Sequence, residues 1–145
     1  MSTRVVVVPP VPALLPEHAS ITDPVAELLL AEAGHRGDVA SGPGGAGDAV
    51  LVLANGSARR GEESPGGADD RAPAFDAGVE KALTDCDGAA LRCLDAELGA
   101  ALMASGTCRL REVGRLLEHG AWTARVLYSG DPFGVQYWVA VLARG

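Results

Sequence analysis

Two short apolar runs in the first half of the chain predict buried β-strands. The first run covers residues 4–8 and holds four consecutive valines, and the second covers residues 49–54. Neither run alternates with polar residues, which is typical of strands buried on both faces of a parallel sheet. Between them, Asp23 and Pro24 predict a helix start, with Asp23 as the N-cap, and this helix is expected to end near Gly34.

The middle of the chain predicts a series of helices. Apolar side chains recur at helical spacing in two segments, at Phe75, Val79 and Leu83 and then at Leu110, Val113, Leu116 and Leu117. Asp87 and Asp95 are placed to cap two short helices between these segments, which we expect to run through Leu91 and Met103.

The C-terminal part changes to a strand pattern. Residues 122–128 and 135–142 are rich in β-branched, aromatic and other apolar side chains, and residues 129–134 between them carry turn residues. These features predict two neighbouring strands joined by a short loop. The whole pattern therefore predicts an α/β fold with a mixed, mainly parallel sheet flanked by helices and a C-terminal hairpin-like strand pair.

A glycine-rich segment separates the first helix from the second strand. Residues 35–48 hold many glycines and no large apolar side chain, so we expect a flexible loop there. Its glycines do not predict a phosphate-binding loop, because no strand is expected before them and no Lys-Ser/Thr pair follows. We expect a single domain over residues 1–145 with this loop inside it.

Composition and charge exclude several classes of function. The chain has 145 residues, a net charge of -7 and Lys81 as its single lysine, which argues against a nucleic-acid partner. No apolar run approaches the ~20 residues of a membrane span, and no signal-peptide pattern is seen, so a cytoplasmic protein is expected. We interpret Cys86, Cys93 and Cys108 as small buried hydrophobes rather than disulfide partners.

Two loops are the expected location of a binding site. Ligand sites in open α/β sheets form at the carboxyl ends of the strands, which here are followed by residues 9–18 and residues 55–61. In the second loop, Asn55, Ser57, Arg59 and Arg60 are candidate ligand-binding residues. The two arginines stand out in an acidic chain, and guanidinium groups suit recognition of a small anionic ligand.

Catalytic and metal-binding candidates are few. Glu17, His18 and Ser57 are the side chains best placed for catalysis in these two loops. The three histidines of the chain, His18, His35 and His119, show no metal-ligand spacing, so no metal site is predicted.

Three segments together resemble the subunit-B-like class III extradiol ring-cleavage dioxygenases, in particular their short actinobacterial members. These segments are residues 8–17, with the sequence VPPVPALLPE, residues 55–60, with Phe75-Asp76 after them, and residues 128–135, with the sequence YSGDPFGV. The resemblance implies an α/β fold with a site at the strand-end loops. In that family two histidines and a glutamate bind Fe(II), and a further histidine acts as acid and base.

The chain departs from that family at the residues that perform the chemistry. The resemblance places one metal histidine at position 10 and the acid/base histidine at position 58, where this chain has Pro10 and Ala58. Another metal histidine of the family falls in the region shortened here to residues 35–48. We therefore expect a degenerate, catalytically silent member with no cofactor, which binds a small ligand or a protein partner and forms a homodimer.

An alternative function keeps catalysis without a metal. In this hypothesis Ser57, Arg59 and Arg60 hold an anionic substrate, and Glu17 or His18 is the acid or base. It is motivated by the polar and basic side chains that remain where the metal ligands are missing.

Overall fold

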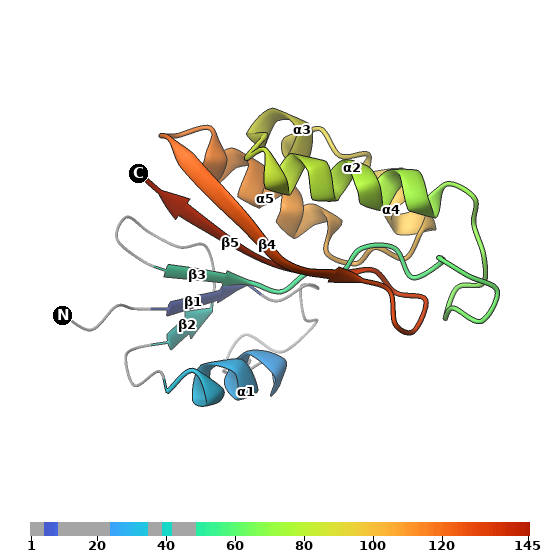
Figure 1. Cartoon of the computed structure of the whole chain (residues 1–145), viewed down its shortest axis with the longest axis horizontal. Coiled ribbons are helices and arrows are strands. Elements are labelled where there is room, and N and C mark those ends of the chain that lie inside the picture. Colours follow the sequence, from blue (N-terminus) through green and yellow to red (C-terminus); the bar gives the residue numbers. More distant parts are fainter. Residues whose placement is uncertain (1–4, 9–23, 35–38, 42–48) are drawn as a thin grey trace. The chain divides into compact units, whose positions relative to one another are not determined.

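The chain divides into two compact units, Met1–Leu53 and Ala54–Gly145, in a computed structural model. The structure describes residues 5–8, 24–34, 39–41 and 49–145. Each unit has a sheet of its own (Figure 1). The prediction of a single domain over residues 1–145 is tested by none of these features and stays a prediction.

The first unit contains a three-stranded sheet. Its elements are β1 (Val5–Val8), α1 (Pro24–Glu32), β2 (Val39–Ser41) and β3 (Ala49–Val52). β1 lies in the centre and pairs in parallel with β2 and with β3. The predicted cap Asp23 lies outside the described residues.

β2 corrects one sequence-based expectation. We expected residues 35–48 to be loop throughout, but Val39–Ser41 form a strand opposite residues 5–7 of β1. A three-residue strand has too few positions to show a period in the sequence, and its hydrogen-bond partners are supplied by β1. The rest of this segment lies outside the described residues.

The second unit has four helices followed by a strand pair among its described residues. These elements are α2 (Ala72–Thr84), α3 (Gly88–Arg92), α4 (Ala96–Ala101), α5 (Thr107–Leu117), β4 (Trp122–Gly130) and β5 (Tyr137–Arg144). The caps are as predicted, because Asp87 accepts a hydrogen bond from the Ala90 amide and Asp95 accepts from the amides of Glu97 and Leu98. An α/β chain with a C-terminal antiparallel strand pair is thus confirmed.

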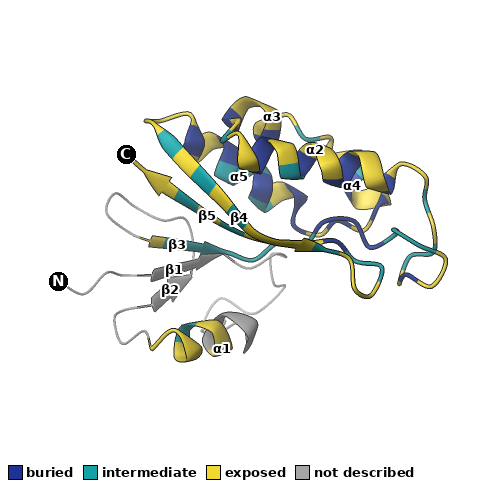
Figure 2. Ribbon diagram, in the orientation of Figure 1, coloured by how far each residue is buried: buried dark blue, intermediate teal, exposed yellow. Residues whose placement is uncertain are grey.

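The core of the second unit lies between the helices and one face of the strand pair. Along β5, Trp138 and Leu142 are half-buried and pack against the core, while Val139 and Val141 are exposed (Figure 2). The most buried large apolar side chains are Val79 in α2, Leu91 in α3 and Leu102, which directly follows α4. A bulge between Val126 and Tyr128 shifts the register of β4 against β5.

α3 and α5 approach each other through glycines. A Cβ atom added to Gly114 would lie 2.6 Å from the Gly88 carbonyl oxygen, and one added to Gly88 would lie 2.6 Å from the Gly114 carbonyl oxygen. These two helices therefore cross with their backbones in contact, a packing that a larger residue at either position would disturb.

The cysteines are more accessible than we expected. Cys93 and Cys108 are exposed and Cys86 is half-buried, and all three are free thiols. The interpretation as small buried hydrophobes is therefore wrong for Cys93 and Cys108. Cys93 directly follows α3 and Cys108 is the second residue of α5, and short helices like these leave most of their surface to solvent. Burial raises the pKa of the Cys86 thiol.

None of the described helices has the length and apolar character that crossing a membrane requires.

Replacement of glycine by alanine should change the free energy of unfolding in opposite directions at Gly114, in the α3–α5 crossing, and at Gly78, on the exposed side of α2. Gly114→Ala should lower the free energy of unfolding by about 1–3 kcal/mol, because the new methyl group meets α3 backbone atoms. Gly78→Ala is the matched control, since its methyl group would meet no atom within 4 Å on the exposed side of α2. It should raise that free energy by roughly 0.5–1 kcal/mol through helix propensity. Urea unfolding measures both, and a Gly114→Ala variant as stable as the parent chain would refute the crossing.

Candidate functional site

The loop after β3 is held in place by backbone hydrogen bonds and a close contact. The Gly56 amide donates to the Gln136 carbonyl at 2.8 Å, and the Gln136 amide donates to the Ser57 carbonyl at 2.9 Å. A Cβ atom on Gly56 would lie 2.5 Å from the Trp138 ring and 2.7 Å from an Asp76 carboxylate oxygen. Only glycine fits there without displacing its neighbours.

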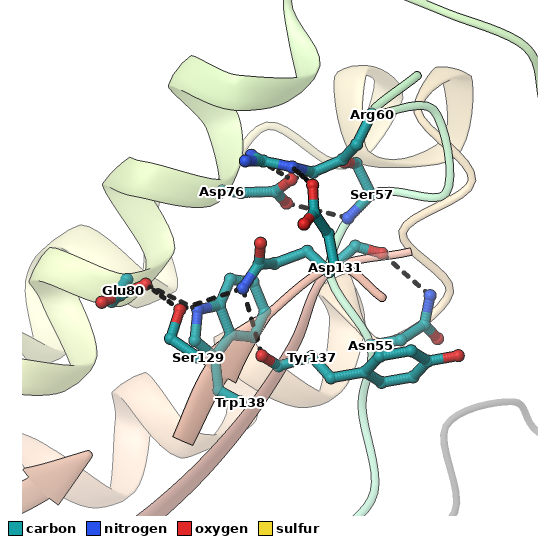
Figure 3. Close-up of polar contacts among 11 residues, drawn as sticks. Asn55, Ser57, Arg60, Asp76, Glu80, Ser129, Asp131, Tyr137 and Trp138 are labelled. Carbon is teal, nitrogen blue, oxygen red and sulfur yellow. Dashed lines mark hydrogen bonds and ion pairs between the residues drawn. The ribbon is translucent and has the colours of Figure 1, made fainter. Parts of the chain in front are cut away.

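A buried carboxylate on α2 organises this loop. Asp76 is 2 % exposed, and its Oδ1 accepts a hydrogen bond of 2.8 Å from the Ser57 amide. Its Oδ2 accepts a hydrogen bond of 2.5 Å from the Ser57 hydroxyl and one of 3.3 Å from Nη1 of Arg60 (Figure 3). Three donors, one of them cationic, satisfy this carboxylate, which would be costly to bury without them.

Arg60 joins the loop to the turn between the two C-terminal strands. Its Nε donates to Asp131 at 2.8 Å, while its Nη1 pairs with Asp76. The hydrogen bond to Asp131 raises the pKa of Arg60, and the contact with Asp76 adds to the effect. The Arg60 amide also donates to the Gly134 carbonyl at 3.3 Å.

An open hollow of about 540 Å³ lies between these two segments. It is lined by residues 60–64 and residues 131–134. Arg60 provides the single cationic side chain of this lining, and Glu62, Glu63 and Asp131 provide three carboxylates. Phe133 lies on the same lining and is 80 % exposed. The volume is in the range of small-molecule sites.

A second polar cluster ties α2 to β4 and β5. Glu80 Oε2 accepts hydrogen bonds from the Ser129 hydroxyl at 2.6 Å and from the Trp138 indole at 3.1 Å (Figure 3). The buried Gln136 donates its side-chain amide to the Ser129 hydroxyl and to the Tyr137 carbonyl. This cluster fixes the strand pair on the helix one turn beyond Asp76.

Arg59 has different partners from Arg60 and connects other parts of the unit. It donates to the carbonyl of Ala101, the last residue of α4, at 3.1 Å, and it pairs with Asp69 at 3.4 Å. The hydrogen bond from Arg71 holds the pKa of Asp69 well below its usual range. A cation at the carboxyl end of a helix also complements the helix dipole.

The structure brings together two of the four predicted ligand-binding residues. Ser57 and Arg60 share Asp76, whereas Arg59 contacts α4, and Asn55 contacts the Ser105 hydroxyl and the Met103 carbonyl. The Ser57 side chain is fully buried. Glu17 and His18 lie outside the described residues, so their predicted roles stay predictions.

Two residues central to this arrangement were missed as site residues. The sequence pattern identifies Asp76 only within the Phe75-Asp76 pair of the family resemblance, and Asp131 only within the predicted turn. A sequence signal for Asp76 did exist, because an acidic residue directly after the buried Phe75 falls near the core face of the predicted helix.

The described residues do not fit the iron that the family resemblance implies. Position 58, where the resemblance places the acid/base histidine, holds Ala58, which is 6 % exposed and has no side-chain group that transfers a proton. Among the described residues, no three His, Cys, Asp or Glu side chains form a group that suits a metal ion. Position 10 is outside the described part of the chain.

Comparison of the chain with models of protein families, with curated proteins and with solved structures finds no match. The likeness to the dioxygenases therefore rests on the segments quoted above.

The two carboxylates that pair with Arg60 should differ in their contribution to stability. Asp76→Asn replaces a buried carboxylate with an amide whose single oxygen cannot accept all three hydrogen bonds from Ser57 and Arg60, and should cost about 2–3 kcal/mol. Asp131→Asn removes the partly exposed partner of the same arginine and should cost about 0–1 kcal/mol. Urea unfolding of both variants measures the difference, and equal losses would contradict the anchoring role of Asp76.

Proposed function

We propose that the protein is a degenerate class III extradiol dioxygenase-like protein that binds a small ligand or a partner without cleaving aromatic rings. The proposed place of binding is the hollow between residues 60–64 and residues 131–134. The proposal includes a homodimer, a cytoplasmic location and, as the finer architecture, a mainly parallel sheet flanked by helices beside the C-terminal strand pair.

The burial of Ala58 is the observation that carries the proposal. The resemblance places the acid/base histidine at this position, and the methyl group found there moves no proton. Its backbone is held on both sides, because its amide donates to the Leu102 carbonyl at 2.9 Å and its carbonyl accepts from the Gly66 amide at 3.0 Å. Position 58 thus contributes packing to the second unit.

The hydrogen bonds of Ser57 also support a silent protein. A serine nucleophile needs an accessible hydroxyl and a base that accepts its proton. The Ser57 hydroxyl is fully buried and donates to a carboxylate that is already shared with Arg60. This arrangement suits a structural role better than attack on a substrate.

The hollow supports binding because it is shaped by residues that are already ordered by contacts with each other. Arg60 connects its two sides through Asp131 and the Gly134 carbonyl. Loops positioned in this way by a scaffold are common locations of ligand sites. The alternative of metal-free catalysis requires Glu17 or His18, which lie outside the described residues, and it stays a prediction.

Metal content and ring-cleavage activity test the proposal. Protein purified without an affinity tag should hold far less than one iron or zinc per chain in elemental analysis, because Pro10 stands where the resemblance places a metal-binding histidine. After incubation with Fe(II), it should form no yellow product from catechols. Stoichiometric iron, or a yellow product formed at a rate proportional to protein concentration, would disprove the silent function.

A further inference from the structure

We propose that the hollow formed by residues 60–64 and residues 131–134 binds a small organic cation through an ammonium or guanidinium group. This inference rests on the proposed binding function and names the chemical class of its ligand. It differs from the anionic ligand expected from the arginine pair in the sequence.

Contacts within the protein itself hold the hollow in shape. Gly134, with a positive φ of 75°, packs so closely on Ser64 that a Cβ atom on the glycine would lie 2.5 Å from the serine Cβ. The Ser64 hydroxyl hydrogen-bonds within its own loop, to the carbonyls of Gly61 and Gly67. Together with the Arg60 contacts, these interactions hold both sides of the hollow at a fixed separation, which lowers the entropic cost of binding.

The charge that lines the hollow is negative. The positive charge of Arg60 is matched by two carboxylates, those of Asp131 and Asp76. Glu62 and Glu63 are exposed and form no ion pair or hydrogen bond with any residue in the described part of the chain. An anion entering the hollow would meet unmatched carboxylates, whereas a cation would pair with them.

An exposed aromatic ring is a separate feature that favours a cation. Phe133 is the most exposed of the large apolar side chains described, at 80 %, and it lies on the lining of the cavity. The ring is not buried in the core, so core packing does not explain why an aromatic residue occupies position 133. The face of an aromatic ring attracts ammonium and guanidinium groups, and a carboxylate on the other side completes a common type of cation site.

NMR titration of the full chain with two small probes tests the inference. Agmatine carries an ammonium and a guanidinium group, and glutarate is an anion of similar size. Agmatine should shift the amide signals of residues 60–64, 131, 133 and 134 in a saturable way with a millimolar Kd, and glutarate at about 20 mM should leave them unchanged. A lysine-containing tripeptide added in competition distinguishes a protein side chain from a free amine as the source of the cation.

Variants show whether the hollow is responsible. Phe133→Ala should raise the Kd for agmatine about threefold, and the Glu62→Gln/Glu63→Gln double variant about fivefold or more. Glu97→Gln is the matched control, because Glu97 is an exposed carboxylate on α4 outside the lining of the hollow. The Kd of this variant for agmatine should equal that of the parent chain. Since all these positions are exposed, the variants should keep the amide spectrum of a folded chain.

Three results would overturn the inference: shifts caused by glutarate instead of agmatine, agmatine shifts that the variants do not weaken, or no saturable shift at all. A glutarate response at the same residues would refute the cationic class while supporting a ligand site. Iron in the purified protein would refute the proposed function whatever the titration shows, so the two failures can be told apart.

Discussion

The buried carboxylate of Asp76 is the constraint on which the arrangement of the second unit depends. α2 carries it into the interior, where the amide and hydroxyl of Ser57 and the guanidinium of Arg60 surround it. A carboxylate that is 2 % exposed would be costly to bury without such donors. The loop after β3 must therefore follow the path that brings these donors to α2, and Gly56 is the residue that allows the close approach.

The same network connects the architecture to the proposed function. Because Arg60 extends from Asp76 to Asp131, the position of the loop also sets the position of the turn between β4 and β5. The hollow lies between these two segments, so its shape depends on the pairing of its lining residue Arg60 with the buried Asp76, which is outside the lining. The polar side chains of Ser57, Arg60 and Asp76 hydrogen-bond to one another, whereas the exposed Glu62, Glu63 and Phe133 lie outside this network.

Local features of the sequence predicted most of the second unit, and long-range contacts account for what it missed. Asp87 and Asp95 cap their helices as expected, because a cap depends on residues two or three positions away. β2 depends on pairing with β1, and the link between Ser57 and Asp76 spans nineteen positions, so neither follows from a local pattern. Arg59 and Arg60 look equivalent in the sequence, yet they face different partners, because their directions are set by the fold of the loop.

Hydrogen exchange at the Ser57 amide tests the central claim most directly. If Asp76 anchors the loop, this amide is protected almost as strongly as the core amides of α2, since exchange then requires the second unit to unfold. The Glu63 amide, for which the described residues provide no hydrogen-bond acceptor, is the internal reference for an exposed loop. Exchange of Ser57 as fast as that of Glu63 would contradict the claim that the buried carboxylate holds this part of the molecule together.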